Sequence, residues 1–417
     1  MEIFFPAIVA LKGTIQANPS KSYMQRALAL TFLTKGTTVL HRPCFSKDSQ
    51  AVLQLLIDAG VVCSELTNEK IILTNQNKQK IYQVNCGESG LFLRMFVPIF
   101  ALFEHSVSFF GTGSLLQRDL KDLENFCKKI GLTYTDTERR LPVMIQGPLH
   151  PQNTQLGTLE SSQYLSGLLM ALPLLEKESF LFFEEIKSSP YIALTISLMQ
   201  KFGVYVETLT DGFHIPGQQT YKPAELTVEG DWSGTAFWIA AALIAAKEPV
   251  AIEGLNPHSL QADQAILQLA KEQNWPVHWF GATLYVHKMD SFPAFTFNAT
   301  LCPDLFPVLA LLACFAKGES CITGLHRLHN KESNRENAIL KTLQGVGVQC
   351  SAEQDNLKIT GQESVSSTLL SSYNDHRIAM LAALLSLRAV DGIMVKDFDA
   401  IDKSYPNFLD HYFQLTN

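Results

Sequence analysis

The stretch AFWIAAALIAAKEPVAIEG, residues 236–254, contains the pattern that decides the fold. Its first part, residues 236–246, is entirely apolar, as expected for a helix that is buried on most of its faces. A short polar turn at Lys247 and Glu248 follows, and the run Val250–Ile252 then indicates a strand. The stretch therefore predicts a buried helix that turns directly into a strand.

The same helix–turn–strand segment occurs six times along the chain. Aligned on one apolar position of the strand, successive copies are separated by 68, 73, 70, 71 and 72 residues. The strands begin with TTVLHR at 37, SVSFFG at 106, SFLFFE at 179, PVAIEG at 249, SCITGL at 320 and GIMVKD at 392, aligned on Val39, Val107, Phe180, Val250, Cys321 and Ile393. A period this regular indicates an internal structural repeat.

An amphipathic helix follows five of these strands, with apolar residues three and four positions apart. These helices are predicted at 51–59, 120–130, 192–202, 265–272 and 336–344. Four of them end in a Gly-containing turn, which is typical of a helix C-terminus, and another short strand comes next. One unit is therefore a strand, an apolar helix, a strand, an amphipathic helix and a further strand.

Six such units divide into two domains of three, since 417 residues exceed what one hydrophobic core usually serves. The break is expected near VEGDWSG at 228–234, and the opening strand can belong to either domain. Helices that are apolar on most faces should lie inside, with the sheets around them. The sequence thus predicts an α/β fold arranged as the reverse of a usual barrel.

Composition narrows the class of protein. The formal net charge of −7 argues against nucleic acid or an anionic membrane as the main partner. Eight cysteines without a CxxC pair predict free thiols in a reducing compartment, with neither disulfides nor a metal site. The start MEIFFPAIVALKG lacks a basic region and a cleavage site, and no apolar run reaches the ~18–20 residues that span a bilayer. We expect a soluble, cytoplasmic protein.

Polar or charged residues precede or open each apolar helix. The segments are SKSYMQR (20–26) with Lys21, Ser22 and Arg26, CGESGLFLR (86–94) with Arg94, ESSQYLSG (160–167) with Ser161, Ser162 and Gln163, GDWSG (230–234), CPD (302–304) with Asp304, and YNDHR (373–377) with His376 and Arg377. Helix N-termini carry unpaired N–H groups and partial positive charge, which favour anions. A cleft lined by Lys21, Arg26, Arg94, Arg118, Arg335, Arg377 and Lys403 would suit a small substrate with several negative charges.

Structural explanations compete with this interpretation. Asp231 and Ser233 are interpreted as ordinary helix N-caps. Lys21 and Arg26 stand at the positive end of a helix, where cations are disfavoured unless a bound anion offsets their charge. These two residues therefore favour an anion site. The segment GLHRLHNKESNR (324–335) fits a charged surface as well as a site, and neither His376 nor DKSYP (402–406) decides anything alone.

Together these segments resemble the family of 3-phosphoshikimate 1-carboxyvinyltransferases, or EPSP synthases, from about Asn18 to Phe408. The motifs are SKSxxxR (20–26), GxSGxxxR (87–94), SSQ (161–163), SxPYI (188–192), PD (303–304), KExxR (331–335), YNDHRxAM (373–380) and KSYP (403–406). The resemblance implies a two-domain inside-out α/β barrel of six βαβαββ units, with the active site in the interdomain cleft. It implies domains at 20–230 and at 1–19 joined to 231–417.

The resemblance also implies the ligands and the residues that bind them. For shikimate 3-phosphate these are Lys21, Ser22, Arg26, Ser161, Ser162, Gln163, Ser188, Tyr191, Asp304 and Lys331. For phosphoenolpyruvate they are Lys21, Gly90, Arg118, Gln163, Arg335, Arg377 and Lys403, with Arg94 and His376 in support. Neither a metal nor an organic cofactor is implied, and a monomer is expected.

The implied reaction transfers the enolpyruvyl group of phosphoenolpyruvate to the 5-hydroxyl of shikimate 3-phosphate, through a tetrahedral intermediate. The hydroxyl loses a proton while C3 of phosphoenolpyruvate gains one, and Asp304, Glu332 and Lys21 are the implied catalytic residues. Lys and Arg side chains stabilise the phosphate and carboxylate groups. Closure of the domains would exclude water.

Several positions depart from the family pattern. Leu91 replaces a usual Thr, Met95 a common Pro and Glu88 a usual Asn, while Asp119, Asn334 and Arg327 are also atypical. Gly90 is expected to leave the space that glyphosate, the inhibitor of the family, requires. Leu91, Met95 and Glu88 nevertheless predict weaker inhibition, and they are expected to alter affinity before they alter the type of reaction.

Two other functions are compatible with parts of this pattern. The sister enzyme that transfers the same group to UDP-N-acetylglucosamine usually carries a reactive Cys before the arginine equivalent to Arg118, and GTGSLLQR (111–118) has none. A non-catalytic protein that binds phosphorylated metabolites would be expected to lose Lys21, Asp304 or Glu332, and all three are present. Both alternatives are testable by phosphate release.

Overall fold

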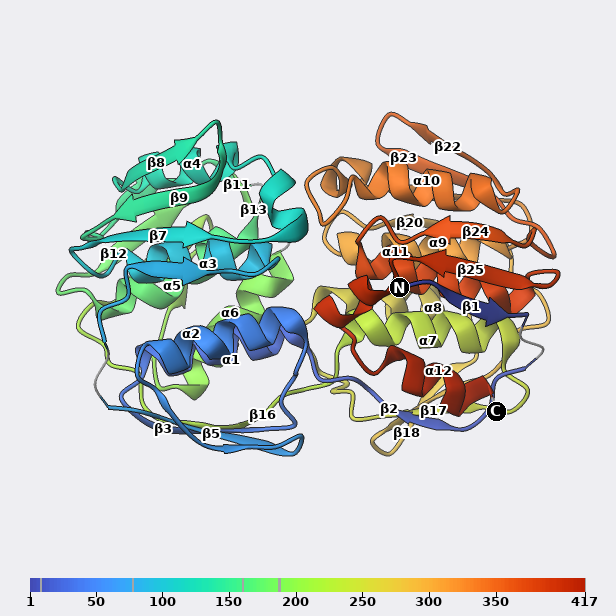
Figure 1. Cartoon of the computed structure of the whole chain (residues 1–417), viewed down its shortest axis with the longest axis horizontal. Coiled ribbons are helices and arrows are strands. Elements are labelled where there is room, and N and C mark those ends of the chain that lie inside the picture. The colour runs from blue at the N-terminus through green and yellow to red at the C-terminus, as the bar shows by residue number, and fades with distance from the viewer. Residues whose placement is uncertain (8–9, 77–78, 160, 187–188, 417) are drawn as a thin grey trace. The chain divides into compact units, whose positions relative to one another are not determined.

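The structure is a computed structural model that describes residues 1–7, 10–76, 79–159, 161–186 and 189–416 (Figure 1). The chain forms two compact units, which we call the middle unit (Pro19–Val228) and the terminal unit (Met1–Asn18 with Glu229–Asn417). The sequence-based limits were 19/20 and 230/231. Each unit is described by itself below.

The middle unit contains the apolar helices α1 (Lys21–Leu33), α3 (Gly90–Phe100) and α5 (Ser162–Ala171) and the amphipathic helices α2 (Lys47–Asp58), α4 (Lys121–Lys129) and α6 (Ser189–Lys201). Its strands are β3 (Gly36–His41), β4 (Val62–Leu66), β5 (Lys70–Asn75), β6 (Gln83–Asn85), β7 (Ser106–Phe110), β8 (Thr133–Thr137), β9 (Arg140–Gln146), β10 (Asn153–Gln155), β11 (Thr158–Leu159), β12 (Ser179–Phe182), β13 (Glu185–Ile186), β14 (Glu207–Thr208), β15 (Gly212–Ile215) and β16 (Glu225–Thr227). The strands predicted after the apolar helices are thus present as β3, β7 and β12.

The terminal unit repeats this arrangement with apolar helices α7 (Trp232–Ala245), α9 (Phe306–Cys314) and α11 (His376–Leu384) and further helices α8 (Ile266–Glu272), α10 (Arg335–Gly345) and α12 (Phe408–Thr416). Its strands are β1 (Ile3–Pro6), β2 (Thr14–Gln16), β17 (Val250–Glu253), β18 (Val277–Phe280), β19 (Thr283–Val286), β20 (Thr296–Asn298), β21 (Glu319–Thr323), β22 (Gln349–Glu353), β23 (Asn356–Thr360), β24 (Thr368–Ser371) and β25 (Gly392–Lys396). Here the predicted strands are β17, β21 and β25, so the repeat is confirmed in both units.

The sheets share one topology. Among the described residues, strand orders β16-β3-β5-β4, β6-β7-β9-β8, β10-β12-β15-β14, β2-β17-β19-β18 and β20-β21-β23-β22 each place a parallel pair beside an antiparallel hairpin. In the last of the six repeats β24 pairs with β25 in parallel. The N-terminal strand β1 completes this sheet in antiparallel register, with Ile3 opposite Val395. A parallel pair needs a crossover connection, which an apolar helix supplies for the pairs β6/β7, β10/β12, β20/β21 and β24/β25.

Two short strands are exchanged between the units. Strand β2 precedes α1 of the middle unit but pairs in parallel with β17, with Thr14 opposite Ala251. Strand β16 precedes α7 of the terminal unit but pairs in parallel with β3, with Glu225 opposite Val39. The chain therefore passes from one unit to the other between a strand and the apolar helix that follows it.

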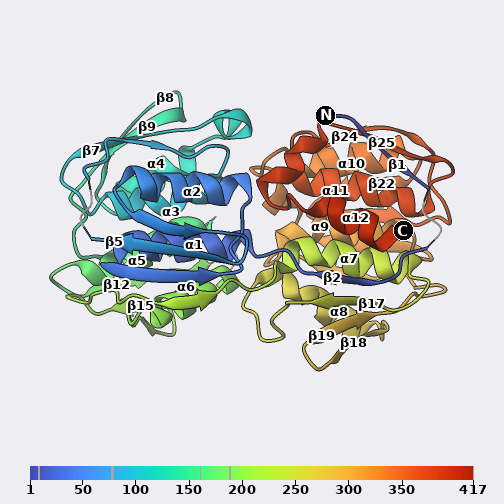
Figure 2. The same ribbon diagram turned by 60° about the horizontal axis from the view of Figure 1, so that its bottom comes forward.

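The apolar helices form the cores, as their composition predicted. Every residue of α7 and α9 is buried, and α7, α9 and α11 pack against one another (Figures 1 and 2). Figure 2 shows β12 and β15, and likewise β17 to β19, on the outside of the helices of their own unit. A Cβ atom on Gly167 of α5 would overlap the Met95 carbonyl oxygen of α3, so glycine is needed for this close approach.

Two details differ from the prediction. Helix α2 starts at Lys47 instead of 51, because the Ser46 hydroxyl caps it by accepting a bond from the Ser49 N–H at 3.3 Å. The helix predicted at 265–272 is preceded by a 3-10 turn, η3 (Ala262–Ala265). All eight cysteines lie in the described part of the chain and carry free thiols, as predicted. Over the described residues, no helix combines the length and the apolar character required to cross a membrane.

Candidate active site

Asp304 is the centre of a charged cluster in the terminal unit. It lies in the 3-10 turn η4 (Pro303–Leu305) before α9. Its Oδ1 accepts bonds from Arg335 Nη1 at 2.7 Å and Lys331 Nζ at 3.4 Å, and its Oδ2 accepts from Arg377 Nη2 at 3.1 Å. Burial raises the pKa of Asp304, but Arg377, Lys331 and Arg335 outweigh it and hold the pKa well below the usual range. Asp304 is therefore an ionised carboxylate.

Arg335, the first residue of α10, connects three carboxylates. Its side chain is fully buried, and it donates from Nε to Asp375 Oδ2 at 2.9 Å, from Nη2 to Glu332 Oε2 at 2.6 Å, and from Nη1 to Asp304. Burial lowers the pKa of Arg335, but the three carboxylates raise it by more than burial lowers it. The net pKa is therefore above the usual value, and the guanidinium stays charged. The flat, five-donor guanidinium suits this role.

The turn at Tyr373–Arg377 collects the remaining groups. Tyr373 and Asn374 have φ values of 52° and 54°, a left-handed conformation that non-glycine residues seldom adopt. The Asn374 carbonyl oxygen then accepts a bond from Lys403 Nζ at 2.7 Å. Asp375 caps α11 by accepting from the Arg377 N–H at 2.9 Å, and His376 is buried at the first position of that helix. The YNDHR motif thus places Lys403, Arg335 and Arg377 around one turn.

Helix α1 of the middle unit begins with two cations in different settings. Lys21 Nζ lies 2.9 Å from Asp48 Oδ2 in a mostly buried ion pair. Arg26 is buried one turn later and donates to Thr195 Oγ1 at 2.9 Å, the Ser22 carbonyl oxygen at 2.9 Å and Ser166 Oγ at 3.4 Å.

The surroundings of Arg26 suit an anionic ligand. Burial lowers its pKa to about 10, so it remains a cation at neutral pH, and its guanidinium lies 5.5 Å from the ring centre of Tyr191. Within the described residues its hydrogen bonds all run to neutral groups. Buried charges are normally paired, so a bound anion would complete this environment.

A second pair of cations covers the start of α3. Arg94 donates to Tyr164 Oη at 2.9 Å and to Gln163 Oε1 at 3.3 Å. A Cβ atom on Gly90 would come within 2.6 Å of Arg94 Nη1 and even closer to Arg118 Nη1. The expectation that Gly90 leaves open space is therefore wrong, because two guanidinium groups occupy the volume above this helix N-terminus. Two cations and free N–H groups together favour an anion here.

Glu88 holds the loop that carries Arg118. Its Oε2 accepts a bond from the Ser114 N–H at 2.8 Å, in the 3-10 helix η1 (Gly113–Gln117) that ends directly before Arg118. Gly113 has a φ of 53°, and a Cβ atom there would overlap the Glu88 carboxylate. The atypical acid at this position thus binds a backbone donor of the loop.

If the chain binds phosphoenolpyruvate, as the resemblance implies, Glu88→Ala should raise KM for this substrate about tenfold, the scale of one hydrogen bond to a charged group. Glu88→Gln, which keeps an acceptor for the Ser114 N–H, should raise it less. The KM values from phosphate release decide between this role and simple repulsion of anions, which predicts that both variants lower KM.

The remaining predicted residues lie at or near the starts of three further helices, α5, α6 and α7. Ser161 caps α5 by accepting from the Gln163 N–H at 3.3 Å, and Ser162 is the first residue of that helix. Tyr191 lies in α6, and Ser188 lies outside the described residues. Asp231 caps α7 as predicted, by accepting from the Gly234 N–H at 2.8 Å. The cap predicted for Ser233 is wrong. Ser233 is the second residue of α7, and its hydroxyl donates to Asp263 Oδ2 in η3 instead of capping the helix.

Sequence analysis missed the acidic partners of these cations. Asp375 is fully buried and binds Arg335, and Asp48 pairs with Lys21. The only local signal for Asp375 was its place before a helix, which an ordinary N-cap also explains. In the described part of the chain no group of three or more His, Cys, Asp or Glu side chains could hold a metal ion.

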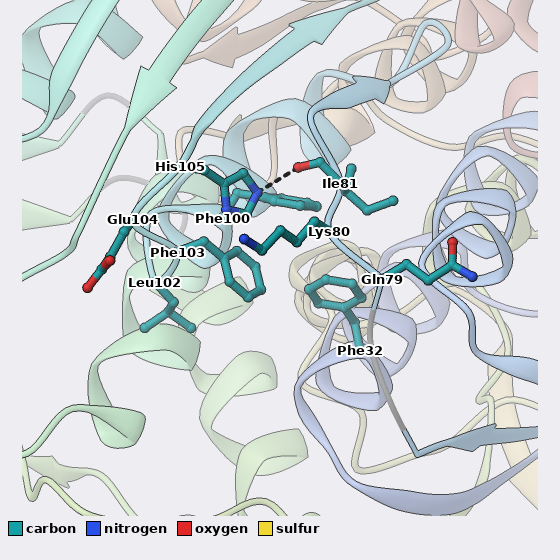
Figure 3. Close-up of a pocket in the computed structure, with 9 residues that line it drawn as sticks. All are labelled: Phe32, Gln79, Lys80, Ile81, Phe100, Leu102, Phe103, Glu104 and His105. Atoms are coloured by element: carbon teal, nitrogen blue, oxygen red, sulfur yellow. Dashed lines mark hydrogen bonds between the residues drawn. The ribbon is translucent and has the colours of Figure 1, made fainter.

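A cavity of about 650 Å³ in the middle unit lies elsewhere (Figure 3). Phe32, Phe100 and Phe103 line it, with Lys80, Glu104 and His105 among the polar residues around them. Phe32 and Phe100 stand at the C-terminal ends of α1 and α3. The cavity therefore lies at the ends of these helices opposite to Lys21 and Gly90, and no predicted site residue lines it.

The chain is similar to known proteins along nearly its whole length. The family described as EPSP synthase (3-phosphoshikimate 1-carboxyvinyltransferase) matches residues 6–412. The 3-phosphoshikimate 1-carboxyvinyltransferase of Clostridium kluyveri is 32% identical over 408 residues, covering 97% of this chain and 95% of that protein. That of Clostridium perfringens is 33% identical over 417 residues, covering 97% and 96%.

Solved structures show the same fold. An EPSP synthase from Acinetobacter baumannii superposes with a TM-score of 0.81 at 22% identity, over 100% of this chain and 98% of that one. The enolpyruvyl transferase NikO from Streptomyces tendae gives 0.79 at 14% identity, over 99% and 97%. The predicted fold class is confirmed, and the match along nearly the whole sequence shows that this chain belongs to the EPSP synthase family.

Proposed function

We propose that the chain transfers the enolpyruvyl group of phosphoenolpyruvate to the 5-hydroxyl of shikimate 3-phosphate and releases phosphate. The observation that carries the proposal is the cluster in which the Asp304 carboxylate and the Glu332 carboxyl group both bind Arg335. Addition and elimination need two proton-transfer groups and fixed cations for the phosphate and carboxylate charges. Membership of the EPSP synthase family supports the same reaction.

Each unit would supply one part of the substrate contacts. In the middle unit we assign shikimate 3-phosphate to Lys21, Ser22, Arg26, Ser161, Ser162, Gln163, Ser188 and Tyr191, with Asp304 and Lys331 from the terminal unit. We assign phosphoenolpyruvate to Lys21, Gly90, Arg118, Gln163, Arg335, Arg377 and Lys403. The neutral surroundings of Arg26 support the first assignment, and the two guanidinium groups over Gly90 support the second.

Binding of phosphoenolpyruvate would also prepare Asp304 for its role. Arg335 and Arg377 hold the pKa of Asp304 low in the absence of substrate. A substrate carboxylate that takes up their remaining charge weakens this hold, so the proton affinity of Asp304 rises. Asp304 would then accept the proton of the 5-hydroxyl. Glu332, on the other side of Arg335, would carry a proton, donate it to C3 in the addition and take one back from C3 in the elimination.

A coupled assay of phosphate release tests the reaction. Phosphate should appear from phosphoenolpyruvate only when shikimate 3-phosphate is added, and UDP-N-acetylglucosamine should not replace it. Release with the nucleotide sugar instead would identify the sister activity. Binding of both ligands without release would identify a non-catalytic protein.

We further propose a cytoplasmic monomer, which the net charge of −7 and the free thiols support.

Glyphosate should inhibit this enzyme weakly compared with family members that have Thr and Pro at positions 91 and 95. Leu91 is bulkier than Thr in the first turn of α3, and Met95 is fully buried where α3 meets Gly167 of α5. A longer inhibitor should suffer more than the compact substrate from such a turn. The double change Leu91→Thr/Met95→Pro should therefore lower the inhibition constant more than KM for phosphoenolpyruvate. An unchanged ratio of the two constants would refute this interpretation of the turn.

A further inference from the structure

The segment Ser259–Asp263 is fixed to the start of α7, although no motif of the family resemblance includes it. Ser259 Oγ donates to Glu229 Oε1 at 2.7 Å. Gln261 accepts from the Trp232 N–H at 3.1 Å and donates to the Gly230 carbonyl oxygen at 2.8 Å. These bonds give the side chain of Asp263, two residues further on, a defined position.

Asp263 is a completely buried carboxyl group that the proposed reaction does not use. Its Oδ2 accepts the Ser233 hydroxyl, whereas its buried Oδ1 has no hydrogen-bond partner among the described residues. The same holds for Nε of Arg377, whose Nη2 binds Asp304. Asp263 and Arg377 interact electrostatically, so this arginine is subject to three carboxylates, Asp304, Asp263 and Asp231.

The setting makes the charge of Asp263 variable near neutral pH. Burial and the nearby Asp304 raise its pKa to about 7, while Arg377 and the Ser233 hydroxyl act in the opposite direction. The other charged or titratable groups that act on it are Asp231 at the start of α7 and the Cys302 thiol before η4. A buried acid with this pKa changes its charge in the range in which enzymes work.

We propose that Asp263 is a positioning residue whose charge decides how firmly Arg377 is retained by the protein or is available to the carboxylate of phosphoenolpyruvate. The inference rests on the proposed function, in which Arg377 binds that carboxylate. Neutral Asp263 leaves the charge of Arg377 to Asp304, Asp231 and the ligand. Ionised Asp263 adds a further internal anion that competes with the ligand.

KM for phosphoenolpyruvate, measured by phosphate release at saturating shikimate 3-phosphate, should rise about tenfold above pH 7 in the wild type. Asp263→Asn keeps the shape but not the charge, so its KM should stay low, with kcat close to that of the wild type. Phosphate esters themselves titrate near pH 6. The ratio of variant to wild type at each pH removes this shared contribution.

Ser233→Ala gives a second, directional test. Losing the hydroxyl that favours the ionised form should move the midpoint of the KM profile to higher pH. Ser259→Ala loosens the same segment without touching the charge, and its profile should parallel the wild type.

Parallel profiles for wild type and Asp263→Asn would overturn the proposal, and an unmoved midpoint in Ser233→Ala would do so even if Asp263→Asn failed to fold. Wild-type protein without phosphate release that depends on shikimate 3-phosphate would instead refute the proposed function.

Discussion

Asp304→Asn and Glu332→Gln should each lower kcat by about 10²–10⁴ while both substrates still bind. Asp304 holds two arginines and a lysine, and Glu332 lies on the other side of Arg335. An amide keeps the shape and part of the hydrogen bonding of each group, but it cannot take up or return a proton. The loss should therefore fall on the chemical step.

Single-turnover phosphate release measures that step directly, and substrate protection against thermal unfolding reports whether binding survives. Glu353→Gln is the matched control, because Glu353 also pairs with a cation, Lys358 at 2.7 Å, but on an exposed hairpin. It should leave kcat unchanged. Normal turnover by either Asp304→Asn or Glu332→Gln would remove that residue from proton transfer.

The same Asp304 variant has a signature in stability. Removing the charge leaves Arg335, Arg377 and Lys331 with less compensation, and breaking a buried pair is destabilising by about 3 kcal/mol. The side chain of Asp304 is 23% exposed, which reduces the effect. The folded-state pKa of Asp304 is depressed, so its contribution is complete above the unfolded pKa of about 3.9 and is lost as pH falls below it. The difference in unfolding free energy between wild type and variant should shrink accordingly in acid.

The repeat and the cores could be predicted because full burial leaves a clear pattern. A helix such as α7, apolar on every face, cannot be confused with a surface helix, and six such helices at one period define the architecture. The residues of β2 and β16 do not by themselves predict the exchange, because each strand has three residues and no periodic pattern. Only the family resemblance implied domain limits that separate each strand from the apolar helix after it. Their partners are set by tertiary packing and not by the strands themselves.

The candidate site divides in the same way. Cations at helix starts were visible because they conflict with the helix dipole. Their carboxylate partners were not, because Asp48, Asp263 and Asp375 come from other segments and each fits a local capping or surface role. The sequence also did not predict that the volume above Gly90 is occupied, because this depends on where the Arg118 side chain lies in the fold. Contacts between side chains of distant segments could therefore not be predicted from this single sequence.

Lys21→Met should lower kcat/KM by about 3 kcal/mol, roughly 10²-fold, with the fold retained. Lys21 is the first residue of α1, where the helix dipole disfavours a cation. Its Nζ pairs with Asp48, and the two side chains are 13% and 9% exposed, so solvent and salt screen the ammonium charge only weakly. A dianionic ligand at the helix start would meet this charge together with the positive end of the helix dipole.

A structural role for the ion pair predicts a different pattern, and Asp48→Asn separates the two. If Lys21 only stabilises the fold through Asp48, then Asp48→Asn and Lys21→Met should lower the midpoint of thermal unfolding alike and leave kcat/KM near the wild-type value. If Lys21 binds phosphoenolpyruvate and shikimate 3-phosphate, Asp48→Asn keeps the ammonium group and should stay within a few-fold of wild type, whereas Lys21→Met loses activity. Near wild-type turnover in folded Lys21→Met would exclude this residue from the site.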